Sequence, residues 1–425
     1  MPGWAATAPR ERAEVLRAAH ELLLAHADEL AELITKENGK PIAEAKGEIT
    51  YSADFFRWYS EEACRLAGQV SVAPAGGGRI LTMLQPVGVA YLISPWNFPA
   101  AMLARKIAPA LAAGCTAISK PAALTPLTAI RMHELCMEAG VPEGVLHTIT
   151  TKDSKAVTKA ILDDDRVRKL SFTGSTEVGR VLLRQCAERV VNTSMELGGN
   201  APFLVFADAD LDAAVEGAMV AKLRHNGETC TAANRFYVEA SVAGEFAERF
   251  AARMAELKVG PGIDPDSQLG PLIDEDGREK VERLVQAALD GGADVVTGGR
   301  RPAGLDRGYF YEPTVLAGVA PGNPVLAEEI FGPVAPITAF EREDEAIDLA
   351  NDSEYGLVAY VYTGDLARGL RVSEALESGM IGLNKGVVSD PAAPFGGVKQ
   401  SGLGREGGHE GVLAFCEQKY IATNW

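Results

Sequence analysis

The 425-residue sequence lacks the features that mark secreted and membrane proteins. Its first residues contain no basic stretch followed by an apolar one, so no secretory signal is predicted. No run approaches the ~18 apolar residues of a membrane-spanning helix, and we expect no membrane partner. The six cysteines show no C-x-x-C spacing, which argues against a disulfide framework or structural zinc and fits a reducing, cytoplasmic location.

Positive charge is also scarce. The chain has 41 lysines and arginines against 58 aspartates and glutamates, a formal net charge of −17. Because nucleic-acid binding depends on clustered lysine and arginine, we expect no nucleic-acid partner. The six histidines are dispersed without metal-ligand spacing, so no metal site is predicted. The length itself predicts two or three domains rather than one compact core.

The first 70 residues have a helical pattern. Apolar residues recur on one face from position 15 to position 30, which predicts one helix from residue 7 or 9 to the Asn38-Gly39 pair. Pro41 predicts the start of a second helix, which we expect to end near Gly68.

From residue 80 onward, short apolar runs alternate with helical patterns. Strands are predicted at residues 87–93, 115–119, 145–150, 167–172, 189–195 and 202–206, and helices at 100–113, 124–139 and 211–224. Further βα units continue to about residue 382, and a last strand is predicted at 418–423. This alternation predicts an α/β fold with a parallel sheet that binds a dinucleotide at its carboxyl edge.

A glycine-rich string at residues 402–407 fits the G-x-G-x-x-G dinucleotide pattern. No predicted strand precedes it and no βαβ unit follows, so the match lacks the context that gives the pattern meaning. We therefore interpret it as a surface or interface loop.

Three residues in separate segments are candidates for catalysis. Cys230 lies in a polar Gly-Glu-Thr-Cys-Thr turn, where a thiol can be exposed and electropositive enough to ionise. Glu196 ends a predicted strand at a glycine turn, where a carboxylate can activate water. Asn97 follows a buried strand, and its amide can donate to an oxyanion. Taken singly, Glu196 is better explained as a surface acid and Asn97 as a turn cap.

Seven short segments, in the right order, resemble the aldehyde dehydrogenase superfamily, and the similarity runs over essentially the whole chain. They lie at residues 95–99, 119–122, 172–179, 195–199, 227–231, 328–333 and 394–397. The resemblance implies a Rossmann-type cofactor domain, an α/β catalytic domain and a β oligomerisation arm. The implied ranges are 1–75 with 94–197, then 198–400, and 76–93 with 401–425. An exposed arm of strands also implies a homodimer or homotetramer.

The resemblance implies a role for each matching residue. Cys230 would attack the aldehyde carbonyl, Asn97 and the Cys230 N–H would stabilise the oxyanion, and Glu196 would activate the water that hydrolyses the thioester. The cofactor would be NADP or NAD. Lys120 would bond the adenosine ribose, and a helix N-terminus would lie near the pyrophosphate. The implied cofactor-binding residues are Trp96, Lys120, Ala123, Gly174, Ser175, Glu329 and Phe331.

Within the superfamily, four stretches resemble the succinate semialdehyde dehydrogenases: residues 55–62, 169–176, 198–203 and 399–406. This implies a substrate with a carboxylate at its far end, held by Arg105 and Arg224 in bidentate forks with help from Ser389. Glutarate semialdehyde would suit the same clamp. Without the resemblance, both arginines would be interpreted as ordinary helix residues paired with local acids.

The sequence departs from the family pattern at three points. Ala123 stands where many NAD-dependent relatives have a glutamate that repels a 2′-phosphate, so NADP is expected to be accepted and slightly favoured. Ala232 stands where some members carry a second cysteine, so no regulatory disulfide is expected. The chain also begins some way into a typical member, and we expect assembly or stability to suffer.

Other functions remain open on the sequence alone. A broad-specificity aldehyde dehydrogenase would keep the chemistry without the clamp. A thiol esterase would leave the cofactor residues idle, and a CoA-acylating dehydrogenase would not need Glu196. A non-catalytic structural relative would need none of the three catalytic residues. Cofactor-dependent turnover of an aldehyde separates these alternatives.

Overall fold

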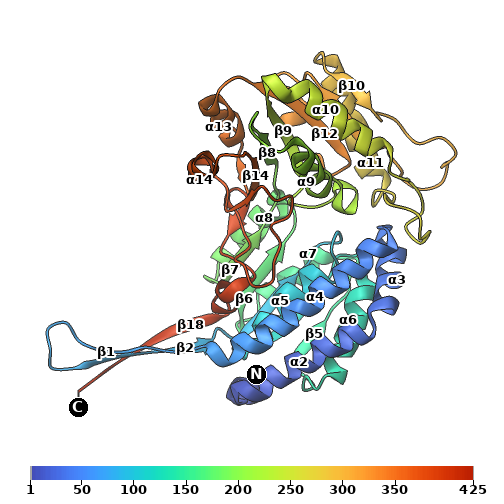
Figure 1. Cartoon of the computed structure of the whole chain (residues 1–425). Helices are drawn as coiled ribbons and strands as arrows, with labels where there is room; N and C mark the ends of the chain where they lie inside the picture. The colour runs from blue at the N-terminus through green and yellow to red at the C-terminus, as the bar shows by residue number, and fades with distance from the viewer. Residues whose placement is uncertain (1, 425) are drawn as a thin grey trace.

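The computed structural model describes residues 2–424, which form two α/β lobes and a projecting arm of strands (Figure 1). The N-terminal helices cover the lower lobe in this view, and the arm extends sideways from the same lobe. Within the described residues, no helix is long and apolar enough to cross a membrane. No group of three or more histidine, cysteine, aspartate and glutamate side chains is placed to hold a metal ion there.

Four helices open the chain: α1 (Pro2–Ala6), α2 (Pro9–Ala25), α3 (Ala27–Asn38) and α4 (Ile42–Glu62). The single helix predicted to end at Asn38 is therefore wrong, because non-helical backbone at His26 separates α2 from α3. The predicted end of the helix at the Asn38-Gly39 pair is confirmed, because α3 ends at Asn38 and Gly39 caps it with a left-handed φ of 87°. After α4 only a short 3₁₀ turn, Ala63–Arg65, continues the helical path.

The lower lobe is built on a six-stranded sheet with the order β17-β7-β6-β3-β4-β5. Its strands are β3 (Val89–Ile93), β4 (Thr116–Lys120), β5 (Leu146–Thr148), β6 (Val167–Thr173), β7 (Asn192–Glu196) and β17 (Gly402–Leu403). All neighbours pair in parallel except β17, which is antiparallel to β7. Helices α5 (Ala101–Ala113), α6 (Pro126–Glu138), α7 (Ser154–Leu162) and α8 (Thr176–Ala187) connect the strands. This confirms the predicted parallel α/β architecture.

The upper lobe contains a seven-stranded sheet with the order β10-β11-β12-β9-β8-β14-β15. Its strands are β8 (Ala201–Val205), β9 (Ala233–Glu239), β10 (Asp294–Thr297), β11 (Thr314–Ala317), β12 (Val334–Phe340), β14 (Val358–Tyr362) and β15 (Met380–Leu383). Its helices are α9 (Leu211–Leu223), α10 (Ala240–Ala255), α11 (Glu275–Asp290), α12 (Pro324–Ala327), α13 (Glu343–Asn351) and α14 (Leu366–Ala375). Only β10 runs antiparallel to its neighbour.

The projecting arm consists of β1 (Val70–Val72), β2 (Arg79–Pro86) and β18 (Cys416–Thr423). Strands β2 and β18 pair antiparallel along their full lengths. Apolar side chains on the arm are open to solvent, with Val70 68% and Tyr420 60% exposed. A two-stranded sheet of β13 (Tyr355–Gly356) and β16 (Val398–Lys399) and the short helix α15 (Gly408–Leu413) complete the fold.

The arm is narrower than the range inferred from the sequence. Residues 76–93 were expected to belong to it, but β3 lies inside the six-stranded sheet, between β6 and β4. The glycine-rich string expected to form a surface loop also contributes to that sheet, because Gly402 pairs with Glu196. A Cβ on Gly402 would lie 1.9 Å from the carbonyl oxygen of Met195, and its φ is 134°. A pairing between segments 200 residues apart leaves no local sequence signal.

Candidate active site

The predicted site residues meet at one edge of the six-stranded sheet. Asn97 follows β3, Lys120 ends β4, Gly174 and Ser175 follow β6, and Glu196 ends β7. These four strands are parallel neighbours, so their carboxyl ends lie side by side. This is the edge at which an open α/β sheet binds its ligand.

A cavity of about 310 Å³ opens at this edge and is lined by residues of both lobes. It brings together eleven of the thirteen predicted site residues: Trp96, Asn97, Arg105, Gly174, Ser175, Glu196, Arg224, Cys230, Glu329, Phe331 and Ser389. Lys120 and Ala123 are not among its lining residues; they lie at and just after the end of β4. The tertiary structure therefore joins the predicted catalytic, nicotinamide-end and clamp residues in one space.

The segment that carries Cys230 begins with a strained turn. His225 and Asn226 both have left-handed backbone, with φ of 49° and 55°. The N–H of His225 donates to Glu44 Oε2 over 2.8 Å, and Asn226 Oδ1 accepts from the N–H of Gly270 over 2.9 Å. These bonds from other elements stabilise a conformation that the two residues would not adopt alone, and they fix the loop that leads to Cys230.

The surroundings of Cys230 differ from the electropositive turn expected from the sequence. Burial raises the pKa of the thiol well above its ordinary value, and the carboxylates of Glu196 and Glu329 raise it further. The guanidinium of Arg105 acts in the opposite direction. The expectation of an exposed, electropositive thiol was wrong because the fold buries Cys230 and brings two carboxylates from distant segments close to it. Ionisation of Cys230 therefore requires a base close to the sulfur.

Glu196 has the properties of such a base. Its side chain is buried, and burial, followed by the charge of Glu406, raises the pKa of its carboxyl to about 7, against a lowering by Arg105. The Cys230 thiol lies close enough to hydrogen-bond this carboxylate and lowers its pKa, and no N–H or O–H group of the described residues bonds either oxygen. A carboxylate that titrates near neutral pH is suited to taking and returning protons.

The side chain of Asn97 is fixed at both ends of its amide. Nδ2 donates to the carbonyl oxygen of Glu228 over 2.9 Å, and Oδ1 accepts from the N–H of Phe98 over 3.1 Å. An amide nitrogen carries two hydrogens, so one remains for a ligand in the cavity. Asn97 thus has a donor that can stabilise an oxyanion.

Arg105 lies deep in the cavity wall. Its side chain is 1% exposed, its Nη2 donates to Tyr51 Oη over 2.8 Å, and its guanidinium stacks 3.9 Å above the ring of Phe395. Nη1 lies 3.8 Å from Glu406 Oε2, and neither Nε nor Nη1 makes a hydrogen bond to the described residues. Two buried guanidinium nitrogens without acceptors lower the stability of the fold unless a ligand supplies the acceptors.

Arg224 is the less buried of the two cations. Its guanidinium lies 5.4 Å from the ring of Phe98, and it has no hydrogen bond or salt bridge to the described part of the chain. Ser389 lines the same cavity. Arg105 thus has one long ion pair, to Glu406, and Arg224 forms no salt bridge to the described residues, although its charge opposes the rise that burial causes in the pKa of nearby Glu44.

The remaining lining residues suit a dinucleotide. Gly174 and Ser175 precede helix α8, and Ser175 caps it by accepting a hydrogen bond from the N–H of Val178. Glu329 accepts a 3.2 Å hydrogen bond from the N–H of Gly199, and burial raises the pKa of its carboxyl to about 7. Phe331 has a left-handed φ of 53° and packs edge-on against Trp96 at 5.6 Å.

Lys120 keeps an unpaired charge at the end of β4. Its Nζ makes only long contacts, 3.3 Å to Ser154 Oγ and 3.4 Å to the carbonyl oxygen of Pro121, and burial lowers its pKa. No carboxylate within the described residues forms an ion pair with it. Ala123, three residues on, is exposed. A cation without an acidic partner beside a small, exposed, uncharged side chain is suited to binding a phosphate or a ribose hydroxyl.

The sequence did not point to a buried charge cluster behind Glu196. Lys106 Nζ contacts Glu406 Oε1, and Ser171 Oγ donates to the same oxygen over 3.2 Å. Glu406, which belongs to the glycine-rich string, raises the pKa of Glu196. The sequence contains one sign of this cluster: Arg105 and Lys106 are the only charged residues on the otherwise apolar helix α5.

Comparison with known proteins places the chain beside well-defined relatives. The sequence model of the aldehyde dehydrogenase family matches residues 1–421. The chain is 56% identical over 418 residues to a succinate-semialdehyde dehydrogenase of Paenarthrobacter nicotinovorans, covering 98% of this chain and 92% of that protein. It is 48% identical to a glutarate-semialdehyde dehydrogenase of Pseudomonas putida, covering 100% and 87%. The crystal structure of an E. coli NADP-dependent enzyme matches it with a TM-score of 0.98 at 48% identity, covering 100% and 88%.

Proposed function

The chain belongs to the aldehyde dehydrogenase family, and from this premise we propose the substrate and the residue roles that its cavity supports. The protein is an NAD(P)-dependent oxidoreductase of the succinate or glutarate semialdehyde type, which converts a short carboxylated aldehyde into the dicarboxylate. Succinate semialdehyde is the substrate we favour. One observation carries the residue assignment: Cys230, Glu196 and Asn97 share a cavity with Arg105, two of whose nitrogens make no hydrogen bond to the described residues, and with Arg224, which forms no salt bridge to them.

The reaction begins with a proton transfer. Glu196 accepts the proton of the Cys230 thiol, and the sulfur attacks the aldehyde carbon, forming a C–S bond while the carbonyl electrons move to oxygen. The amide of Asn97 and the backbone N–H of Cys230 donate to that oxyanion. Burial of the thiol makes this transfer necessary, because it holds the pKa of Cys230 above its ordinary value.

Hydrolysis completes the turnover. A nicotinamide dinucleotide, bound along the β6 and β3 edge, would supply the hydride acceptor that converts the thiohemiacetal on Cys230 into a thioester. Glu196 first releases the thiol proton to solvent. It then takes a proton from water, and the hydroxide adds to the thioester carbon. The Asn97 donor stabilises the new oxyanion. The C–S bond then breaks, Glu196 returns its proton to the sulfur, and the carboxylic acid leaves with the Cys230 thiol restored. Retention of a buried Glu196 beside the Cys230 thiol favours water over CoA as the acceptor.

The two arginines select the substrate. The unpartnered Nε and Nη1 of Arg105 and the free guanidinium of Arg224 can bind a carboxylate in bidentate geometry. Ser389 supplies a hydroxyl in the same cavity. A second cavity of about 360 Å³ shares Tyr51, Phe98, Arg224 and Ser389 with the first. This extra space favours glutarate semialdehyde as the second candidate.

The cofactor residues support both dinucleotides, with NADP slightly favoured. Lys120 and Ser154 present a cation and a hydroxyl where the ribose would lie, and Ala123 offers no negative charge against a 2′-phosphate. Trp96, Gly174, Ser175, Glu329 and Phe331 would hold the pyrophosphate and nicotinamide ends.

We also propose a homodimer or homotetramer that works in the cytoplasm. The exposed apolar residues of β1 and β18 leave the arm open to pairing with a second copy of the chain. The domains would be a cofactor lobe, a catalytic lobe and this arm, with boundaries close to those of the two main sheets.

Initial rates of reduced nicotinamide formation test the proposal. Succinate semialdehyde, glutarate semialdehyde and an uncharged aldehyde of equal length are each measured with NAD and with NADP. A large preference for the carboxylated aldehydes supports the Arg105 and Arg224 clamp. Equal rates for charged and uncharged aldehydes would leave a broad-specificity dehydrogenase, and no rate with any pair would leave the non-catalytic alternative.

A further inference from the structure

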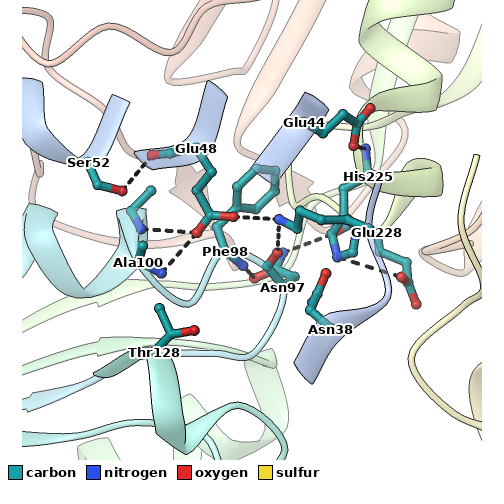
Figure 2. A network of polar contacts seen from close by, with 12 residues as sticks. Asn38, Glu44, Glu48, Ser52, Asn97, Phe98, Ala100, Thr128, His225 and Glu228 are labelled. Carbon is teal, nitrogen blue, oxygen red and sulfur yellow. Dashed lines mark hydrogen bonds and ion pairs between the residues drawn. The ribbon is translucent and has the colours of Figure 1, made fainter. Parts of the chain in front are cut away.

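The backbone around Asn97 is held by side chains from the junction of α3 and α4. Asn38 Nδ2 donates to the carbonyl oxygen of Trp96 over 3.0 Å. Lys40 Nζ donates to the carbonyl oxygen of Asn97 over 2.7 Å, a bond drawn as a dashed line at Asn97 in Figure 2. Two consecutive carbonyls of the turn therefore have donors from one short segment, 57 and 58 residues away in sequence.

Glu48 fixes the other end of the same turn. Its Oε1 accepts from the N–H groups of Ala100 and Ala101, over 2.9 and 3.2 Å, at the start of helix α5. Its Oε2 accepts from Lys40 Nζ over 2.6 Å (Figure 2). The turn that carries Asn97 is thus held on both sides by one ion pair.

This ion pair is completely buried. The side chains of Lys40 and Glu48 are both 0% exposed, and Lys40 Nζ lies 3.9 Å above the ring of Phe98. Burying two charges costs desolvation energy that an apolar pair of the same volume would avoid, so net stability is a poor explanation for it. Control of geometry explains it better, because the pair ends on backbone groups of a turn in the candidate active site.

The same helix also reaches the nucleophile loop. Glu44, one turn before Glu48 on α4, accepts a 2.8 Å hydrogen bond from the N–H of the strained His225 (Figure 2). Asn97 Nδ2 in turn donates to the carbonyl oxygen of Glu228, two residues before Cys230. Helix α4 therefore contacts both the oxyanion turn and the nucleophile loop, which come from different lobes.

We propose that Lys40 and Glu48 are positioning residues that set the place of the Asn97 amide relative to Cys230. The inference rests on the oxyanion role proposed for Asn97. Lys40 does not touch the substrate; it acts by fixing the Asn97 carbonyl, while Glu48 orients Lys40 and anchors the first turn of α5. An amide displaced by about 1 Å would lose much of its stabilisation of the oxyanion, at a cost of up to roughly 10²-fold in rate.

The first test separates positioning from folding stability. Lys40→Met and Glu48→Gln each leave one buried charge, whereas the double variant removes both charges at similar volume. Thermal unfolding, kcat and KM are measured for all three, with Lys36→Met as control, since the exposed Lys36–Glu32 pair lies on α3 away from the turn. We expect the double variant to recover stability while its kcat stays roughly tenfold or more below wild type, with little change in KM. Recovery of kcat together with stability would overturn the proposal.

The second test uses a reaction that needs the thiol but no oxyanion. Alkylation of Cys230 by iodoacetamide displaces iodide at a saturated carbon, so it does not depend on the Asn97 donor. We expect the double variant to be alkylated at the wild-type rate and to form reduced nicotinamide about tenfold more slowly in a single turnover. Equal losses in both reactions would show a general defect of the site and would contradict a positioning role.

A double-mutant cycle with Asn97→Ala identifies the path of the effect. If Lys40 acts through Asn97, then Lys40→Met should cause no further loss of kcat in the Asn97→Ala background. Additive losses would overturn the proposal while leaving the oxyanion role of Asn97 intact. A wild-type rate for Asn97→Ala alone would instead overturn the oxyanion role and the positioning inference together.

Discussion

The side-chain amide of Asn97 donates a 2.9 Å hydrogen bond to the carbonyl oxygen of Glu228. One residue follows β3 of the lower lobe and the other lies in the loop before Cys230 of the upper lobe, so this bond ties the proposed oxyanion donor to the nucleophile loop. A bond across the two lobes means that the reactive geometry depends on how the lobes pack. The predictions below test the chemistry built on that geometry.

Replacing Cys230 by alanine should abolish aldehyde oxidation, because no thioester can form without the sulfur. The expected result is a fall in cofactor reduction of at least about 10³-fold with either dinucleotide. Cys64→Ala is the matched control, since that thiol is exposed and outside the cavity. Residual dehydrogenase activity in Cys230→Ala that equals wild type would rule out the thioester mechanism.

The pH profile should report the ionisation of Glu196. Burial and Glu406 raise the pKa of Glu196 to about 7, and the base acts in its ionised form. Activity should therefore rise with pH through about 7 and be lost below it, measured as kcat against pH at saturating substrate. Glu196→Gln should lower kcat by about 10²- to 10⁴-fold at neutral pH. A profile that is flat from pH 6 to 8 would remove Glu196 from the role of base.

Arg224→Ala should impair carboxylated aldehydes selectively. Loss of charged hydrogen bonds to the substrate carboxylate should reduce kcat/KM for succinate semialdehyde by roughly 10- to 200-fold. The uncharged aldehyde of equal length serves as the internal control and should be affected little. Parallel losses on both aldehydes would mean that Arg224 supports the fold of the cavity instead of binding the carboxylate.

Ala123→Glu should shift cofactor preference towards NAD. A carboxylate three residues after Lys120 would repel a 2′-phosphate, whereas the ribose hydroxyl of NAD can donate a hydrogen bond to it. The ratio of kcat/KM for NADP to that for NAD should fall, whereas Ala123→Gln, of nearly equal size and no charge, should change it much less. An unchanged ratio in Ala123→Glu would place the 2′-phosphate elsewhere.

Gly402→Ala should destabilise the protein and its active-site edge. The added Cβ would lie 1.9 Å from the Met195 carbonyl oxygen, at a φ of 134° that alanine rarely adopts, so β17 must move away from β7. The free energy of unfolding should fall by roughly 2–4 kcal/mol, measured by denaturant titration. Gly244→Ala is the control: nothing lies within 4 Å of the added Cβ, and the residue is helical. A neutral Gly402→Ala would contradict the pairing with β7.

Local patterns in the sequence determined much of this protein. Apolar periodicity predicted the alternating strands and helices, because each element must bury a regular face whatever its partners. Motif order predicted the residues that line the cavity, and eleven of the thirteen do so. Boundaries were less certain: the break at His26 and the end of α4 depend on backbone geometry that no strong breaker residue marks.

Only the tertiary structure decided which buried charges meet. Lys40, Glu48 and Glu406 lie in segments far from Asn97 and Glu196, and a lone charged residue in a helix or loop carries no sign of its partner. The same reason explains Cys230: its local turn is polar, but burial in the folded protein and carboxylates from elsewhere in the chain raise the pKa of its thiol. Electrostatic effects depend on distance in space and on burial, and neither is written in local sequence.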